Sequence, residues 1–205
     1  MGYGPNPNEV VALIQKTVRL TILGNHDNVS LGRENPEHFN KHASAAIEWT
    51  RNILNEDTKS YLETLPFIES TDEYYYVHAS PKSPADWFYV NSLDEAVEAF
   101  EFFHQDFCFI GHTHCPSLVV EGADQSYKIL DEDEIILSEG QRVLVNVGSV
   151  GQPRDRNNKA SFAIWDTEAR QVNLYRVDYD IYKTQEAMRE KKLPSFLIHR
   201  LQEGR

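Results

Sequence analysis

Short apolar runs, each followed directly by polar residues, recur in the first half of the chain and predict buried strands. The runs are Val18 to Leu23, Tyr74 to Val77 and Phe107 to Ile110. They are rich in β-branched and aromatic residues, as strands buried on both faces of a sheet are. The pattern therefore predicts that these three strands are neighbours in one sheet.

Helical spacing of apolar residues predicts the segments between these strands. Asn6, Pro7 and Glu9 form a helix start, and Ser92 with Glu95 forms a capping box at another. Further helices are predicted over Phe39 to Leu54, Thr58 to Leu65 and, with a break at Pro194, Ile181 to Gly204. Gly24 to Arg33 is predicted to be a long loop.

After His114 the pattern changes to short strands separated by turn residues. The predicted strands are Leu118 to Glu121, Ser126 to Leu130, Ile135 to Leu137, Arg142 to Val147, Phe162 to Trp165 and Val172 to Val177. No repeat, low-complexity tract or linker interrupts residues 1–205. We therefore expect a single α/β domain over the whole chain.

Charge and composition narrow the classes of function. The net charge is −12 and the isoelectric point is about 5.1, which argues against binding of a nucleic-acid backbone. An acidic protein that acts on phosphates needs metal ions to reverse the local sign of charge. No apolar run approaches the roughly 20 residues of a membrane span, no signal peptide opens the sequence, and two cysteines are too few for a disulfide framework. We expect a cytoplasmic protein without membrane contact.

The polar residues at the strand ends are of the types that bind metals. Asn25, His26 and Asp27 follow the first run, His78 follows the second, and His112 and His114 follow the third. Strand ends of an open α/β sheet meet at one crevice, where ligands bind, and imidazole is the commonest metal ligand. A single His-x-His would favour a polar turn with exposed histidines. Three strand ends that each carry residues of metal-binding types favour a metal site.

These residues, in this order, resemble the last three metal-site motifs of the calcineurin-like metallophosphoesterases. The motifs are Gly24 to Asp27, His78 and Gly111 to His114. Further stretches are similar to a bacterial and archaeal branch of that family: Gly2 to Pro7, Val77 to Pro81, Asn146 to Asp155 and Arg200 to Arg205. The resemblance implies an αββα sandwich of two mixed sheets flanked by helices.

The resemblance also implies a chemistry, in which a hydroxide that bridges two divalent metal ions attacks a phosphoester. Asn25, His78 and His112 would hold one ion, and His114 would contribute to the other. His26 would be the general acid or a hydrogen-bond donor to the transition state, and Asp27 would orient it. Mixed imidazole and oxygen ligands suit Mn, Fe, Zn or Ni.

Four further residues are candidates for substrate binding. Arg154 lies in a glycine-rich loop and could offer a two-pronged guanidinium to a phosphate. The alternative for Arg154 is a surface ion pair with Asp155. Tyr3 and Asn6 are expected to line the same crevice. Lys82 is a weaker candidate, since a solvated lysine is the better explanation.

Two motifs of the family are absent from this sequence: an Asp-x-His, and a Gly-Asp that supplies the carboxylate bridging the two ions. Asn25, His78, His112 and His114 are all electrically neutral, and two nearby dications without an anionic ligand would repel strongly. We therefore expect residues 1–205 to be an N-terminally incomplete metallophosphoesterase that lacks its first βαβ segment.

The sequence thus predicts a metal-dependent phosphoesterase acting on a small phosphorylated substrate, either a phosphomonoester, a phosphodiester or a nucleotide. One alternative is a mononuclear zinc hydrolase with three histidine ligands. Another is a degenerate domain of the same fold that binds a phosphorylated ligand or partner without turnover.

Overall fold

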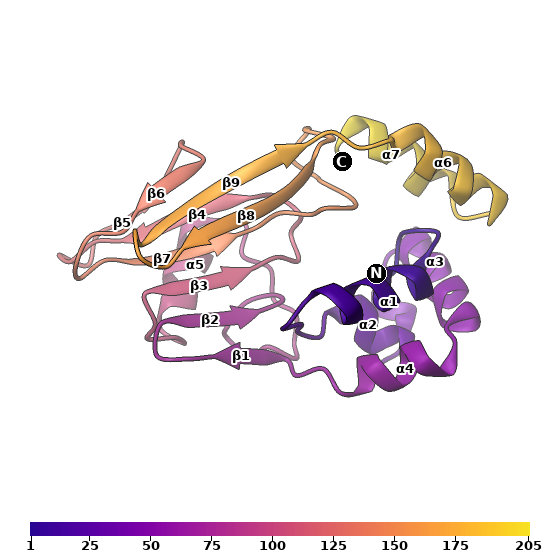
Figure 1. Ribbon diagram of the computed structural model, residues 1–205, viewed down its shortest axis with the longest axis horizontal. Coiled ribbons are helices and arrows are strands. Elements are labelled where there is room, and N and C mark those ends of the chain that lie inside the picture. Colours follow the sequence, from indigo (N-terminus) through magenta and orange to yellow (C-terminus); the bar gives the residue numbers. More distant parts are fainter.

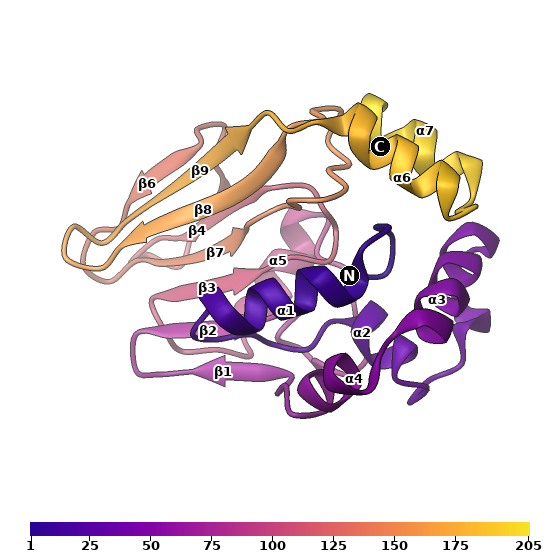
Figure 2. The same ribbon diagram turned by 45° about the vertical axis from the view of Figure 1, so that its right-hand side comes forward.

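Two β-sheets pack face to face, and helices flank them on one face and at one end (Figures 1 and 2). The computed structural model describes residues 1–205. This arrangement confirms the predicted α/β class, with two sheets flanked by helices. No helix is both long enough and apolar enough to span a membrane.

The larger sheet has six strands in the order β1-β2-β3-β7-β4-β5. Its strands are β1 (Ile68–Ser70), β2 (Tyr74–Val77), β3 (Phe107–Ile110), β4 (Ser117–Glu121), β5 (Tyr127–Ile129) and β7 (Arg142–Asn146). The three central strands β2, β3 and β7 are parallel, and the outer strands are antiparallel to their neighbours. The carboxyl ends of the three central strands therefore meet at one edge of the sheet.

The smaller sheet has three antiparallel strands in the order β6-β9-β8. They are β6 (Glu134–Ile136), β8 (Ala160–Asp166) and β9 (Gln171–Val177). All six strands predicted after His114 are confirmed, within two residues at each end. They were readable as short apolar runs separated by turn residues.

The core between the sheets is built from one face of β3, β4 and β7. Phe107, Leu118 and Val143 pack there with Val172 of the smaller sheet, and all four side chains are almost fully buried. Trp165 of β8 stacks at an angle against Phe107, with ring centroids 4.9 Å apart. This contact joins the two sheets at β3, the strand that the His-x-His motif follows.

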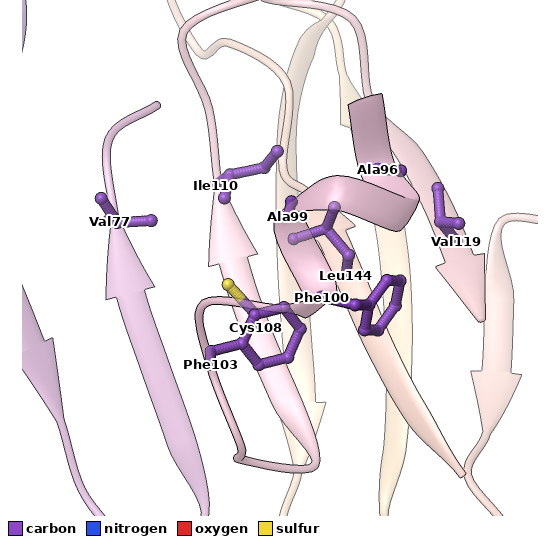
Figure 3. Close-up of a cluster of buried hydrophobic side chains, with 9 residues drawn as sticks. All are labelled: Val77, Ala96, Ala99, Phe100, Phe103, Cys108, Ile110, Val119 and Leu144. Atoms are coloured by element: carbon purple, nitrogen blue, oxygen red, sulfur yellow. The ribbon is translucent and has the colours of Figure 1, made fainter. Parts of the chain in front are cut away.

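The opposite face of the larger sheet is covered by α5 (Leu93–Phe100), as Figure 3 shows. Phe100 and Phe103 lie over Cys108 and Leu144, the side chains of which point away from the smaller sheet. The predicted capping box is present, since Ser92 Oγ accepts from the Glu95 amide and the Glu95 carboxylate accepts from the Ser92 amide. With both faces covered, β3 is buried along its whole length, as predicted.

The remaining helices gather beside the sheets (Figures 1 and 2). They are α1 (Pro7–Thr17), α2 (Asn25–Ser30), α3 (Lys41–Ile53), α4 (Glu56–Glu63), α6 (Ile181–Glu190), α7 (Ser195–Glu203) and a 3-10 turn at Pro36–His38. The helices predicted at Asn6, Phe39, Thr58 and Ile181 are all present, and the last is broken at Pro194. Ala46 of α3 packs with Met188 and Leu197, so α3 contacts α6 and α7.

Two predictions for the N-terminal part were wrong. Val18 to Leu23 is extended but is not a strand, because β1 pairs with the outer side of β2 and this segment finds no ladder. It is instead held by the Leu23 amide, which donates to Pro66 O at 2.7 Å, and by Tyr61, which donates to Thr21 Oγ1 at 3.0 Å. The predicted loop after Gly24 begins with a short helix, α2, because Asp27 caps its first turn.

Candidate metal and phosphate site

The candidate site lies where the central strands of the larger sheet end. His78 follows β2, Gly111 to His114 follow β3, and the glycine-rich loop that ends at Arg154 follows β7. The first turn of α2 brings Asn25 and His26 to the same place. A cleft of about 1000 Å³ opens there, and its lining includes Asn25, His26, His112, His114 and Arg154.

Three metal-donor atoms converge beside this cleft, which Asn25 and His112 line, whereas His78 lines an adjoining cavity. His78 Nε2 lies 3.0 Å from Asn25 Oδ1 and 3.3 Å from His112 Nδ1. Bonds of about 2.0–2.1 Å to one ion place neighbouring ligands about 3.0 to 3.4 Å apart. The two distances from His78 Nε2 therefore match those between neighbouring ligands of one ion.

Gly24 allows this close approach. A Cβ atom at Gly24 would lie 3.1 Å from the His78 ring and 3.2 Å from the Asp27 carboxylate. Any side chain at this position would therefore press on a candidate ligand. The glycine that precedes Asn25 is needed for the packing of the site.

The two histidines of the His-x-His motif both have a left-handed backbone conformation, with φ of 63° at His112 and 64° at His114. This conformation is sparsely populated by residues other than glycine and costs about 1–2 kcal/mol at each position. Such strain persists where the surrounding structure enforces it, and it is most frequent at functional sites.

His114 is fixed by a hydrogen bond to the loop that follows β7. Its Nδ1 donates to the backbone carbonyl of Gln152 at 2.7 Å. Because a carbonyl only accepts, Nδ1 carries the proton and Nε2 keeps its lone pair for a ligand. His114 is therefore prepared as a metal ligand, although it is not part of the three-atom cluster.

Burial keeps the site histidines neutral at pH 7. Desolvation lowers the pKa of His78 to about 4, against the opposing charge of Asp27, and lowers the pKa of His112 and His114 to about 3. Arg154 lowers the pKa of the last two further. Neutral imidazoles are the form that binds metal, so all three histidines are in the correct protonation state.

The residues fit one divalent ion better than two. Asn25, His78 and His112 provide one amide oxygen and two imidazoles at ligand spacing. Within residues 1–205, no three His, Cys, Asp or Glu side chains are arranged to hold a metal ion, so the cluster depends on Asn25. The number of ions, predicted to be two, stays a prediction.

His26 lies at the rim of the cleft between two aromatic rings. Its ring centroid is 4.3 Å from that of Tyr3 and 5.2 Å from that of Phe39. Gly2 backs it so closely that a Cβ there would lie 2.3 Å from His26 Nδ1. Desolvation, followed by the N-terminal ammonium, lowers the pKa of His26 well below its usual value. A neutral imidazole is thereby held in a fixed orientation.

Asp27 makes its contacts elsewhere. Its Oδ2 accepts from the Gly24 amide at 3.0 Å, and its Oδ1 lies 3.4 Å from the N-terminal amine of Met1. No hydrogen bond joins it to His26 in residues 1–205. The orienting role predicted for Asp27 stays a prediction.

Arg154 faces the cleft, and the alternative of an ion pair with Asp155 is wrong. Asp155 pairs instead with Arg176, which the strand β9 places beside it. Arg154 donates through Nη2 to Tyr3 Oη and to Gln152 Oε1, each at 3.2 Å. The loop after β7 thus positions both His114 and Arg154.

The other substrate-binding candidates also reach the site. Tyr3 lines the cleft, and Asn6 lines an adjoining cavity of about 480 Å³ that it shares with Asn25, His26 and His114. Lys82 does not line the cleft, and it pairs with Glu98. The roles of Tyr3 and Asn6 in binding stay predictions.

Several residues of the cleft were not singled out from the sequence. Tyr89 lies against His112 with ring centroids 4.2 Å apart, and Trp87 lies 5.9 Å from the His78 ring. Phe39, Phe196 and Arg200 are among the other residues that line the cleft. Only the run of aromatic residues at 87–89, in a proline-broken loop, was a usable signal in the sequence.

Known proteins resemble this chain over its whole length. The sequence model of the calcineurin-like phosphoesterase superfamily domain matches residues 3–170. An uncharacterised protein of Methanocaldococcus jannaschii, MJ0912, is 37% identical over 211 residues, which cover 100% of this chain and 84% of that protein.

Two solved structures are similar as well. A metallophosphoesterase from Sphaerobacter thermophilus has a TM-score of 0.87 and 36% identity, covering 100% of this chain and 85% of that one. The hypothetical protein PH1004 from Pyrococcus horikoshii has a TM-score of 0.74 and 21% identity, covering 100% of this chain and 82% of that one, and it supports the fold alone.

Proposed function

Because the chain belongs to the calcineurin-like phosphoesterase superfamily, we propose that it hydrolyses a small phosphorylated substrate with the help of a divalent metal. The observation that carries the proposal is the convergence of Asn25 Oδ1, His78 Nε2 and His112 Nδ1 at ligand spacing. Asn25 lies in the first turn of α2, and His78 and His112 follow β2 and β3.

The metal-binding role is assigned to Asn25, His78 and His112, with His114 contributing through its free Nε2. A divalent ion bound there supplies a Lewis acid that polarises the phosphoryl group and lowers the pKa of bound water. The donor set of imidazoles and an amide oxygen suits Mn, Fe, Zn or Ni. Arg154, which lines the same cleft, adds positive charge toward a bound phosphate.

His26 is assigned the transition-state hydrogen bond to the leaving oxygen. Its lowered pKa keeps it neutral at pH 7, which fits a hydrogen-bond donor better than a cationic general acid. Tyr3 and Phe39 hold the ring from two sides, so its orientation does not need to be established during the reaction.

The test is hydrolysis of bis-p-nitrophenyl phosphate by the purified chain with Mn(II) added. Turnover that requires the metal and disappears in a His112→Gln variant supports the proposal. Metal and phosphate binding without turnover would overturn it in favour of a degenerate domain that only binds. Metal content by elemental analysis then distinguishes two ions per chain from the single ion of a mononuclear hydrolase.

A further inference from the structure

One buried asparagine binds the turn that carries His112 on both sides of that histidine. Asn146 is the last residue of β7 and is 1% exposed, and the register of the sheet places it opposite Ile110, the last residue of β3. Its Nδ2 donates to Gly111 O at 3.0 Å and to Thr113 Oγ1 at 2.8 Å. The two acceptors belong to the residues directly before and directly after His112.

The turn that these bonds hold is a strained one. The Thr113 amide donates to Gly111 O at 2.7 Å, which is the i to i+2 hydrogen bond of a γ-turn, and the central residue, His112, has a φ of 63°. A γ-turn with positive φ is rare in proteins, and a strained backbone persists where the surrounding structure enforces it. Asn146 supplies two such contacts, one to the carbonyl that closes the turn and one to the hydroxyl that follows it.

An amide side chain matches the groups that face Asn146. The Gly111 carbonyl can only accept, and the Gly148 amide, which donates to Asn146 Oδ1 at 3.0 Å, can only donate. An asparagine offers two N–H donors and one carbonyl acceptor, whereas a carboxylate has no donor and an aliphatic side chain has neither. All three bonds of Asn146 are therefore specific to an amide at this position.

The same side chain anchors the loop that fixes His114. Gly148, which Asn146 binds, lies at the start of the glycine-rich loop and has a φ of 74°. Further along this loop, Gln152 O accepts from His114 Nδ1 at 2.7 Å, and the Arg154 amide donates to His114 O at 3.0 Å. Asn146 thus joins the His-x-His turn to the loop that binds its second histidine.

We propose that Asn146 is a positioning residue of the metal site, which holds His112 and His114 in the orientations that bind metal and does not contact the ion. The inference rests on the metal-binding part of the proposed function. His112 Nδ1 lies 3.3 Å from His78 Nε2, and a change in the backbone of the turn would carry the His112 ring away from that position. Groups that orient metal ligands typically contribute about 10- to 100-fold to metal affinity.

The test is titration of Mn(II) into the full chain and its variants, followed by the EPR signal of the free ion. Asn146→Ala removes all three hydrogen bonds, and we expect it to weaken Mn(II) binding by about tenfold or more. Gln185→Ala is the matched control, because Gln185 is similarly buried and its amide donates to a backbone carbonyl, Ile198 O, at 2.7 Å. Both variants should unfold at a lower temperature than the wild type, but the control should bind Mn(II) within about twofold of it.

Thr113→Val is a second variant, for the case in which Asn146→Ala does not fold. It replaces the hydroxyl that accepts from Asn146 with a methyl group and leaves the bond to Gly111 O in place. Because one hydrogen bond of Asn146 remains, we expect a smaller loss of Mn(II) affinity, of about threefold or more. Circular dichroism at the temperature of the titration shows whether each variant is folded.

The inference is overturned if folded Asn146→Ala binds Mn(II) as tightly as Gln185→Ala does. Where Asn146→Ala does not fold, it is overturned if Thr113→Val binds Mn(II) as tightly as the wild type does.

Hydrolysis of bis-p-nitrophenyl phosphate by the wild type keeps the two proposals apart. Metal-dependent hydrolysis, together with unchanged Mn(II) affinity in the variants, removes the role of Asn146 alone. Weakened Mn(II) binding in the variants, without hydrolysis by the wild type, removes the proposed function and leaves Asn146 as a positioning residue of a domain that only binds metal. A wild-type chain that binds no Mn(II) removes both proposals.

Discussion

His112 Nδ1 lies 3.3 Å from His78 Nε2, although 34 residues separate the two in the sequence. The contact exists because β2 and β3 are parallel neighbours, so that the residues following each strand meet at the same edge of the sheet. Together with Asn25, the pair forms the part of the site on which metal binding is expected to depend.

Replacing His112 with glutamine is expected to lower the metal content of the purified protein. The change removes one of three clustered donors, and a single lost ligand weakens metal binding by orders of magnitude. The measurement is Mn(II) or Zn(II) content by elemental analysis after dialysis. His104→Gln, at an exposed position away from the cleft, is the matched control, and equal metal content in the two variants would contradict the assignment.

Replacing His26 with glutamine should lower turnover without lowering the metal content. His26 is assigned to the leaving oxygen and not to the metal, so metal content stays near the wild-type value. Loss of a positioned donor or acid lowers kcat by about 10²- to 10⁴-fold. Steady-state kinetics with bis-p-nitrophenyl phosphate measures the loss, and a variant with normal kcat would show that His26 is structural.

The stability of the metal-free protein should fall as the pH falls below 6.5. The pKa of His78 is lowered to about 4 in the folded chain from its usual 6.5, so the unfolded chain binds more protons between these values. Stability from this group is present above pH 6.5 and is lost as the pH falls toward 4. Between pH 7 and pH 5 the loss is on the order of 2 kcal/mol.

Urea denaturation of the wild type and His78→Gln, in EDTA at several pH values, isolates this contribution from that of the carboxylates. The variant should lose less stability on acidification than the wild type does. His104→Gln should behave like the wild type, because that imidazole is exposed. Parallel pH curves for all three proteins would show that His78 is not buried as described.

Gly204 should not tolerate a side chain. Its φ is 62°, and a Cβ atom there would lie 2.8 Å from the backbone of Asn157. Gly204→Ala is expected to destabilise the protein by about 1–3 kcal/mol and to displace Arg200. Gly151→Ala, where a Cβ would meet nothing within 4 Å, should change the free energy of unfolding by less than about 0.5 kcal/mol. Thermal unfolding compares the midpoints of the two variants. Equal midpoints would contradict the docking of the end of α7 against the loop at Asn157.

The sequence by itself determined most elements and the residues that collect at the site. Short apolar runs located β2 and β3, and short runs between turn residues located the strands of the second half, because burial in a sheet requires apolar side chains wherever the strand lies in space. His78 and His112 could be named in advance, because parallel strands deliver their following residues to one edge. Asn25 could be named from its motif, although a helix turn and not a strand end brings it to the site.

Tertiary structure decided what depends on partners distant in the chain. Val18 to Leu23 has the composition of a strand, yet pairing is a property of two segments, and β1 occupies the edge beside β2. Asp155 was considered as a partner of its neighbour Arg154, and the position of β9 gave it Arg176 instead. The docking of α7 against the loop of Arg154 carries no local signal either, because it joins Asn158 and Gln202, which lie 44 residues apart in the sequence.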